Sequence, residues 1–180
     1  MSPEDILDFW FAPECKSCWF NATNEMDEMI RNRFESAWEA ARNEALAGWK
    51  ETAEGCLALV IVLDQLPLNM YRGKAESFMT EALARDISQH AIQQGFEKSM
   101  SEEQKMFLFL PFMHSENIED QHTSVTLFEQ AGMMDSVRWA KHHRDIVQRF
   151  GRFPHRNKIL GRENSSDEEA YMQSDEAFTG

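Results

Sequence analysis

Apolar residues recur at intervals of three and four along most of the chain, which is the period of an α-helix with one buried face. This pattern predicts a long surface helix over residues 24–47, ending before Gly48. No segment alternates apolar and polar residues with a period of two, so the expected fold class is all-α. Further amphipathic helices are predicted over residues 2–11, 74–94, 117–131 and 135–150.

Two segments, residues 56–63 and 106–113, are apolar on every side, which is typical of buried helices. The β-branched residues in the first segment would also suit a strand, but helical patterns on both sides favour a helix. We expect Pro67 to stop the first of these helices and Pro111 to kink the second.

Capping patterns place the helix ends. Ser101 with Gln104, and Ser166 with Glu169, have the spacing of a capping box at a helix start. Glycines close three of the predicted helices as C-terminal caps, at Gly95, Gly132 and Gly151. Residues 152–162 then form an irregular loop rich in arginine, and residues 174–180 are expected to fray. The chain is thus predicted to be one domain over residues 1–180, with about seven or eight helices.

The charge balance excludes several classes of function. Among 180 residues, 18 are basic and 31 acidic, which gives a net charge of −13. Such a surface repels nucleic acid and anionic lipid, so neither is an expected partner. The chain start lacks the basic stretch of a signal peptide, and no run of eighteen apolar residues is free of charge. These features predict a cytoplasmic protein that does not cross a membrane, and they carry no signal for an oligomeric state.

The cations are concentrated near the C-terminus. Between Arg138 and Arg162 the only acidic residue is Asp145. This basic segment either neutralises the acidic ends of other helices or forms a pocket in which guanidinium groups grip a carboxylate or phosphate. Glycine-rich phosphate loops and dinucleotide fingerprints are absent, so no cofactor is expected, and a bound anion would be held by side chains and loop backbone.

Polar clusters follow both all-round apolar segments. A buried carboxylate such as Asp64 or Glu116 requires a cation or donors, and either one could activate water as a general base. His114 or His155 could donate a proton, whereas His143 lies on the apolar stripe of Trp139, Ile146 and Phe150 and is expected to be buried. An equally weighted alternative is that these carboxylates only tie loops and helix ends together. The candidate catalytic residues are Asp64, His114, Glu116 and His143.

Metal-binding motifs are incomplete. Glu119 and His122 form a single E-x-x-H, whereas a di-iron site needs a second such motif. Cys15 and Cys18 form one C-x-x-C without the further ligands of a zinc site or the context of a redox pair. We therefore predict no metal site and interpret the two cysteines as having no shared role.

Several motifs together resemble a known family. They are Leu63-Asp64-Gln65-Leu66-Pro67-Leu68-Asn69-Met70-Tyr71-Arg72-Gly73, Phe109-Leu110-Pro111-Phe112-Met113-His114-Ser115-Glu116, Asp120-Gln121, and His143-Arg144-Asp145-Ile146-Val147-Gln148-Arg149-Phe150-Gly151-Arg152-Phe153-Pro154-His155-Arg156-Asn157. This set is similar to the signature of an uncharacterised bacterial family, domain of unknown function 924. The resemblance implies antiparallel helix pairs like those of tetratricopeptide folds, and it supplies no reaction. Leu68 stands where the family pattern usually has arginine, which would leave one cation fewer at a ligand site.

The motifs and the basic segment together supply candidate ligand-binding side chains: Gln65, Asn69, Arg72, Gln121, Arg144, Arg149, Arg152, His155, Arg156 and Asn157. One hypothesis is a pocket for a small anionic molecule, with acid/base hydrolysis as its chemistry. In that pocket Arg152, His155 and Arg156 would fold back onto Asp64 and Glu116. The other hypothesis is a helical scaffold that binds a peptide or protein partner without catalysis.

Overall fold

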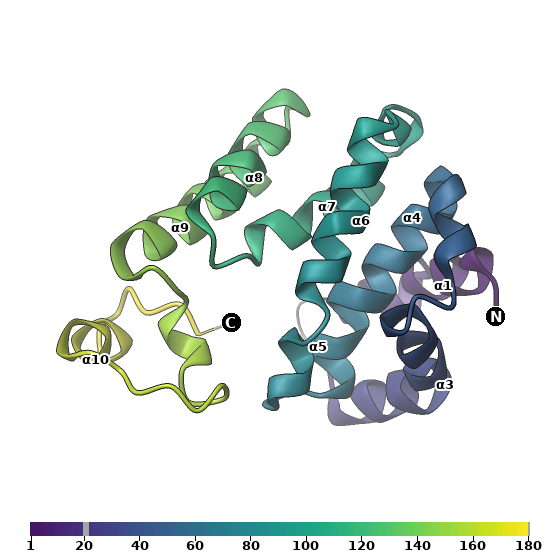
Figure 1. The fold of residues 1–180 in the computed structure, drawn as a ribbon. Coiled ribbons are helices and arrows are strands. Elements are labelled where there is room, and N and C mark those ends of the chain that lie inside the picture. Colours follow the sequence, from purple (N-terminus) through teal and green to yellow (C-terminus); the bar gives the residue numbers. More distant parts are fainter. Residues whose placement is uncertain (20–21, 180) are drawn as a thin grey trace. The chain divides into compact units, whose positions relative to one another are not determined.

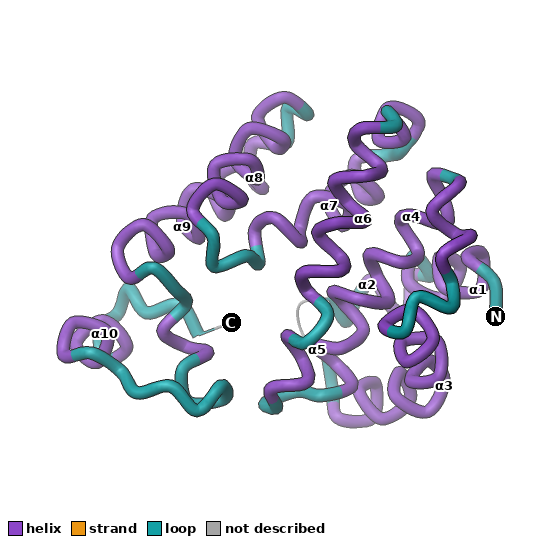
Figure 2. The backbone as a smooth tube through the Cα atoms, in the orientation of Figure 1, coloured by secondary structure: helices purple, strands orange, loops and turns teal. Residues whose placement is uncertain are grey.

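The computed structural model describes residues 1–19 and 22–179, and their elements are helices and turns with no strand among them (Figures 1 and 2). The predicted all-α fold is therefore confirmed. By its internal contacts the chain separates into two compact units. Unit 1 comprises residues 1–72 and 76–111, and unit 2 comprises residues 73–75 and the chain from Phe112 onward.

Unit 1 is built mainly from helices in its described residues. Its α-helices are α1 (Pro3–Trp10), α2 (Pro13–Lys16), α3 (Asn24–Arg42), α4 (Ala53–Val60), α5 (Leu66–Met70), α6 (Glu81–Gln93) and the greater part of α7 (Glu102–Met113). Its shorter turns are η1 (Ala47–Glu51), the π-helical η2 (Ile61–Gln65), most of η3 (Ala75–Phe78) and η4 (Phe96–Ser99). Helix α4 packs against α1 and α6, and α3 packs against α5. The apolar α4 thus lies at the centre of this unit.

Unit 2 contains α8 (Ile118–Gln130), α9 (Met134–Phe150), the short turn η5 (Pro154–Arg156) and α10 (Ser166–Met172). Helices α8 and α9 lie side by side (Figure 1). A small apolar core of Ile146, Val147, Phe153 and Tyr171 joins α9 to the loop and to α10. Phe178, in the stretch expected to fray, packs against this core, and its N–H donates to the Tyr171 hydroxyl at 2.9 Å.

Helix α3 ends at Arg42, earlier than the predicted end near residue 47. Glu44 takes a left-handed conformation with φ of 57°. The N–H of Ala45 then donates to the Ala40 carbonyl at 2.9 Å, which is the six-to-one bond of a Schellman ending. The apolar period continues past this point, but the helix ends without a glycine because Glu44 takes the position where glycine is usual.

Pro67 does not stop the buried helix, contrary to the prediction. Helix α4 widens into the π-turn η2, in which the Leu66 N–H donates to the Ile61 carbonyl five residues back. Pro67 falls in the first turn of α5, where a missing N–H is tolerated. The helical path therefore continues from Ala53 to Met70 as α4, η2 and α5.

The missing N–H of Pro67 is compensated from a neighbouring segment. In a regular α-helix residue 67 would donate to the Leu63 carbonyl, which Pro67 is unable to do. The buried hydroxyl of Thr80 donates to that carbonyl instead at 2.5 Å, and accepts the indole N–H of Trp38 at 3.0 Å. This bond ties η2 to the start of α6.

The predicted capping signals are confirmed with one shift. Ser101 and Gln104 exchange their two reciprocal bonds at 2.9 and 3.3 Å before α7, which continues across Pro111. The box before α10 is formed by Ser165 and Glu168, one residue earlier than predicted. Glu168 was overlooked because Glu169 gives the same spacing from Ser166.

One helical stretch, residues 53–70, is long and apolar enough to cross a membrane by length and composition, with a mean hydropathy of 1.3. However, 83% of it is buried inside the protein. A core helix of a soluble protein has the same properties, so this stretch is explained by its central position in unit 1.

We predict that Thr80→Val destabilises the protein by at least about 2 kcal/mol, because each buried polar group left without a partner costs about 1–3 kcal/mol. The groups affected are the Leu63 carbonyl and the Trp38 indole N–H. Urea unfolding followed by circular dichroism measures the change. Thr126→Val is the matched control, since that exposed hydroxyl bonds only the His122 carbonyl of its own helix. Equal stability of the two variants would contradict this account of Pro67.

Candidate functional site

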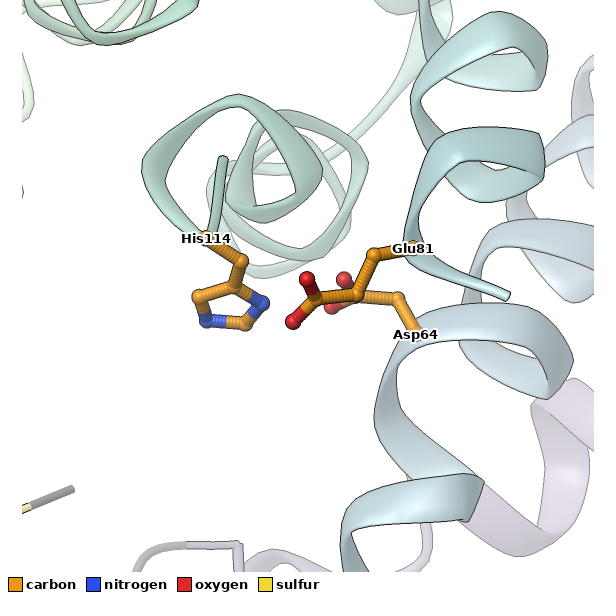
Figure 3. Close-up of side chains that lie close together, drawn as sticks. All are labelled: Asp64, Glu81 and His114. Carbon is orange, nitrogen blue, oxygen red and sulfur yellow. The ribbon is translucent and has the colours of Figure 1, made fainter. Parts of the chain in front are cut away.

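Asp64 and Gln65 lie on the π-turn η2 of unit 1, and both are buried. The Gln65 amide donates to Oδ2 of Asp64. A carboxylate oxygen of Glu81, the first residue of α6, lies within 4.8 Å of one from Asp64 (Figure 3). Turns of this type inside α-helices are frequent at functional sites. His114, also labelled in Figure 3, belongs to unit 2 and is described with it.

Asn69 and Arg72, two predicted ligand-binding residues, both bind Asp27 of α3. The Asn69 amide donates to Asp27 at 2.8 Å, and Arg72 donates through Nε and Nη2 at 2.6 and 2.9 Å. Partial burial favours a higher pKa for Asp27, but the bonds from Arg72 and Asn69 outweigh it and hold that pKa below the ordinary value. These contacts tie α5 to α3.

Glu116 in unit 2 anchors the arginine-rich loop. Its Oε1 accepts the Phe153 N–H at 2.8 Å and Nη2 of Arg162 at 2.9 Å, and its Oε2 accepts Nη1 of Arg162 at 2.7 Å. Burial acts to raise the pKa of Glu116. The hydrogen bonds from the Arg162 guanidinium and the Phe153 N–H together outweigh burial, so the pKa of Glu116 lies below its ordinary value. The residue predicted as a general base is thus positioned as a loop anchor, and its partner Arg162 was not among the predicted site residues.

Arg152 has a different partner from the one predicted. Its Nε and Nη2 bind the two carboxylate oxygens of Glu168 at 2.7 and 2.8 Å, and Nη2 also donates to the Glu163 carbonyl. These bonds, with the Ser165 N–H, lower the pKa of Glu168 to about 2 despite burial. Arg152 was expected to bind Asp64 or Glu116. Its Nε and Nη2 instead donate to Glu168, the carboxylate that caps α10.

His143 is buried on α9, as predicted, with 8% of the residue exposed. Its Nδ1 lies 2.9 Å from the Trp139 carbonyl. A carbonyl only accepts hydrogen bonds, so Nδ1 carries the proton. Burial, which outweighs that bond, together with nearby His114, His142 and Arg156, lowers the pKa of His143 to about 3. The ring is therefore neutral near pH 7, and its Nε2 is an acceptor.

The Phe153 ring brings further basic groups to His143. The centroids of His143 and His155 each lie 5.6 Å from that of Phe153, and the Arg156 guanidinium lies over the same ring at 4.7 Å. His114 acts electrostatically on both His143 and His155. We refer to His114, His143, His155 and Arg156 as the histidine–arginine cluster.

His155 is half-buried, and its Nδ1 has no hydrogen-bond partner in the described part of the chain. Burial is the main cause that lowers the pKa of this ring to about 4, followed by the repulsion from Arg156. Both rings are therefore uncharged at neutral pH beside the buried guanidinium of Arg156. Acid/base catalysis near neutral pH is most efficient for groups whose pKa lies near that pH, so a bound anion would have to raise the pKa of both rings for them to act in this way.

Two aromatic side chains flank the cluster. The centroid of Phe178 lies 4.6 Å from that of His143 and 5.0 Å from that of His155. Trp139, which lies on the same predicted stripe as His143, is 49% exposed. Trp139 lies at the rim of that stripe and packs edge-on against His142. The spacing of apolar residues in a sequence predicts the buried face of a helix, but it does not show which residues at the edges of that face are exposed to solvent.

The other predicted ligand-binding residues of unit 2 make local contacts. Arg144 pairs with the neighbouring Asp145, and Arg149 lies over the rings of Phe150 and Tyr171. The Gln121 amide donates to the carbonyls of Met113 and Ser115, both at 2.7 Å. Asn157 donates to Asn164 at 2.8 Å. These side chains stabilise the framework around the cluster.

The cysteines of the C-x-x-C motif are free thiols. Cys15 lies in α2, and burial raises its pKa to about 11. A reactive thiol requires a lowered pKa, so this geometry favours the interpretation without a redox role.

Surface hollows occur elsewhere in unit 1. One lies on α3 and is lined by Glu25, Glu28, Met29, Asn32 and Arg33, none of which was a predicted site residue. The hollow is open to solvent and contains no converging set of catalytic groups, so it does not replace the predicted site.

Comparison with known proteins places the chain in a family. A family profile described as a bacterial protein of unknown function, DUF924, matches residues 6–176. The chain belongs to the DUF924 family. Its fold is similar to the solved structure of a protein of unknown function from Agrobacterium tumefaciens, with 41% sequence identity and a TM-score of 0.88. The likeness covers 95% of this chain and 96% of that one. A comparison with curated proteins found no match.

The DUF924 resemblance expected from the sequence motifs is therefore confirmed. The matched span includes the π-turn, Glu116 and the loop that carries Phe153 and Arg156. Since the family and the solved relative are both described as having unknown function, a function has to be argued from the site itself.

We predict that Arg162→Ala lowers the free energy of unfolding by about 2–3 kcal/mol, because Glu116 would lose its charge-assisted bonds. Arg144→Ala is the control, since its ion pair with the neighbouring, exposed Asp145 should contribute less than about 0.5 kcal/mol. Chemical denaturation measures both. Unchanged stability of Arg162→Ala would show that Glu116 does not anchor the loop.

We also predict an acid-sensitive stability term from His143. Its pKa is about 3 in the folded protein and near 6.5 when unfolded, so the unfolded chain binds an extra proton between these values. Stability should therefore fall as pH drops below 6.5, by up to about 1.4 kcal/mol per pH unit for this group. His143→Gln should remove that slope, whereas His122→Gln, an exposed control, should keep it. Parallel pH profiles of wild type and His143→Gln in denaturant unfolding would contradict the assignment.

Proposed function

We propose that this DUF924 protein is a cytoplasmic protein that binds a small anionic molecule at the histidine–arginine cluster of unit 2. The observation that carries the proposal is the combination of a buried guanidinium, Arg156, with His143, a neutral imidazole whose orientation is fixed through Nδ1. A guanidinium binds carboxylate or phosphate through paired N–H donors. A neutral imidazole beside it is suited to removing a proton.

The charge around His155 supports this ligand class. Two guanidinium groups, Arg156 and Arg162, and one carboxylate, Glu116, act on the ring. Glu116 is hydrogen-bonded to Arg162 through both of its oxygens. An anion at the cluster would interact favourably with both imidazoles, because a nearby negative charge eases their protonation.

The chemistry that fits this arrangement is acid/base catalysis of hydrolysis. Nε2 of His143 would take a proton from water or from a hydroxyl group of the bound molecule. The Trp139 carbonyl stabilises the imidazolium formed in that step, because it accepts the hydrogen bond from Nδ1–H before and after the proton is taken up. His155, whose Nδ1 has no partner in the described chain, is the proposed proton donor once a bound anion has raised its pKa and the ring is protonated.

A second candidate function is supported by a separate observation. Trp139 and Met134 on α9 are 49% and 67% exposed, and large exposed apolar residues are enriched where proteins bind partners. This surface would serve a tetratricopeptide-like scaffold that binds a peptide. The first proposal accounts for the buried polar groups, which a surface scaffold leaves unexplained.

We predict that inorganic phosphate stabilises the full-length protein against heat, by about 2.7 kcal/mol at a concentration 100 times its dissociation constant. Arg156→Gln and, separately, His155→Gln should reduce the shift in melting temperature caused by phosphate. Arg144→Gln is the control on the same unit and should respond as wild type does. Differential scanning fluorimetry at fixed ionic strength measures the shift. No shift of wild type with either phosphate or acetate would refute the anion site and favour the scaffold.

A further inference from the structure

Phe178 covers the two imidazoles of the cluster that lie against Phe153. The Phe178 ring meets His143 and His155 edge to face, with centroid distances of 4.6 and 5.0 Å. Phe153 contacts the same two imidazoles, at 5.6 Å each. Phe153 is fully buried, whereas Phe178 is partly exposed. Of the two phenyl rings, Phe178 is therefore the one that lies nearer to solvent.

Few interactions hold the segment that carries Phe178. In the described part of the chain, residues 175–179 make two hydrogen bonds. The Ala177 N–H donates to the Ser174 carbonyl at 3.2 Å, and the Phe178 N–H donates to the Tyr171 hydroxyl at 2.9 Å. Most residues of this segment are exposed. A segment with few buried contacts opens at a low free energy, while the helices below it stay folded.

The hydroxyl that holds Phe178 belongs to a firmly packed side chain. Tyr171 lies in α10, is buried in the small core of unit 2, and packs against Phe150 at 5.0 Å between ring centroids. The start of α10 is fixed in turn by the ion pair of Glu168 with Arg152. The acceptor of this bond is thus fixed, and its donor lies on the weakly held segment.

Phe178 packs on the outside of a core that is complete without it. The buried members of that core are Ile146, Val147, Phe153 and Tyr171, and all four lie within the residues 6–176 that match the family profile. Phe178 follows the matched span. We therefore expect the fold of unit 2 to persist when the Phe178 ring is removed.

We propose that residues 175–179 form a strap that closes over His143 and His155 and opens to admit molecules from solution to these rings. The strap is closed in this structure, with the Phe178 ring as its cover and the bond to the Tyr171 hydroxyl as its latch. That the admitted molecule is an anion rests on the proposed function, whereas the opening itself does not.

Opening changes the chemistry of the two imidazoles as well as their accessibility. Burial is the main cause that lowers the pKa of His143 to about 3 and that of His155 to about 4. Water that reaches the rings in the open form stabilises their charged state, so both pKa values move towards the ordinary value near 6.5. The strap therefore also controls how readily these rings take up a proton.

Diethyl pyrocarbonate acylates neutral imidazoles, and peptide mass spectrometry of the treated full chain gives the rate for each histidine. In Phe178→Ala we expect His143 and His155 to react at least about tenfold faster than in wild type, from the value of burying a phenylalanine ring. Tyr171→Phe removes the latch hydroxyl and keeps the ring, so the expected acceleration is about fivefold, the value of one net hydrogen bond. Thr179→Ala, an exposed position on the strap, is the matched control and should react as wild type does.

Two further measurements separate opening of the strap from a general loss of structure. His90 is half-buried on α6 of unit 1, so its rate should be the same in all variants. In wild type, hydrogen exchange should be faster at the Phe178 amide than at the Val147 amide of α9, because the strap opens while the helix stays folded. This comparison holds even if neither strap variant folds.

The outcomes keep the strap and the anion site apart. Unchanged rates at His143 and His155 in folded Phe178→Ala would overturn the strap, and so would an equal acceleration at His90. Exchange at Phe178 as slow as at Val147 would also overturn it, because opening would then require unfolding of the unit. If these tests support the strap and phosphate still fails to shift the melting temperature of wild type or of Phe178→Ala, the anion site alone is refuted.

Discussion

The arrangement of unit 2 depends on the carboxylate of Glu116. Both of its oxygens are hydrogen-bonded to Arg162, and one also accepts the Phe153 N–H. The loop after α9 has little regular structure of its own, so its backbone depends on bonds of this kind. The Phe153 ring held in this way lies against His143, His155 and Arg156. Glu116, which the sequence suggested as a general base, is thus observed to hold the loop that carries Phe153 and the basic residues next to it.

Backbone hydrogen bonding has a comparable role in unit 1. A proline within a buried helical path leaves a carbonyl without its usual donor, and a buried orphan carbonyl is unfavourable. The π-turn and the Thr80 hydroxyl resolve this together. The same turn carries Asp64 and Gln65, so the segment that satisfies the backbone also carries two buried polar side chains.

Local rules recovered most of the helices, because capping and apolar period depend on neighbours within a few residues. The sequence could not show that Pro67 would be accommodated, since the compensating donor, Thr80, lies thirteen positions away in the sequence. The partners of the arginines were missed for a similar reason. Arg152 and Arg162 lie in one basic segment, and only the fold determines that one pairs with Glu168 and the other with Glu116. Burial of His143 was recoverable because it lies on a helical stripe, but its tautomer depends on the contact with the Trp139 carbonyl, which the sequence pattern does not show.

The charge of the whole chain and that of the cluster have opposite signs, and this contrast bears on how an anion would bind. A net charge of −13 opposes the approach of anions at long range. Salt screens that repulsion beyond about 8 Å at physiological ionic strength, whereas buried groups are screened far less. Under the proposed function, recognition would have to come from contacts made at short range, through the histidine–arginine cluster. Such contacts depend on hydrogen-bond direction as well as on charge, so the orientation of His143, fixed through its Nδ1, would weigh more in the choice of ligand than the overall field does.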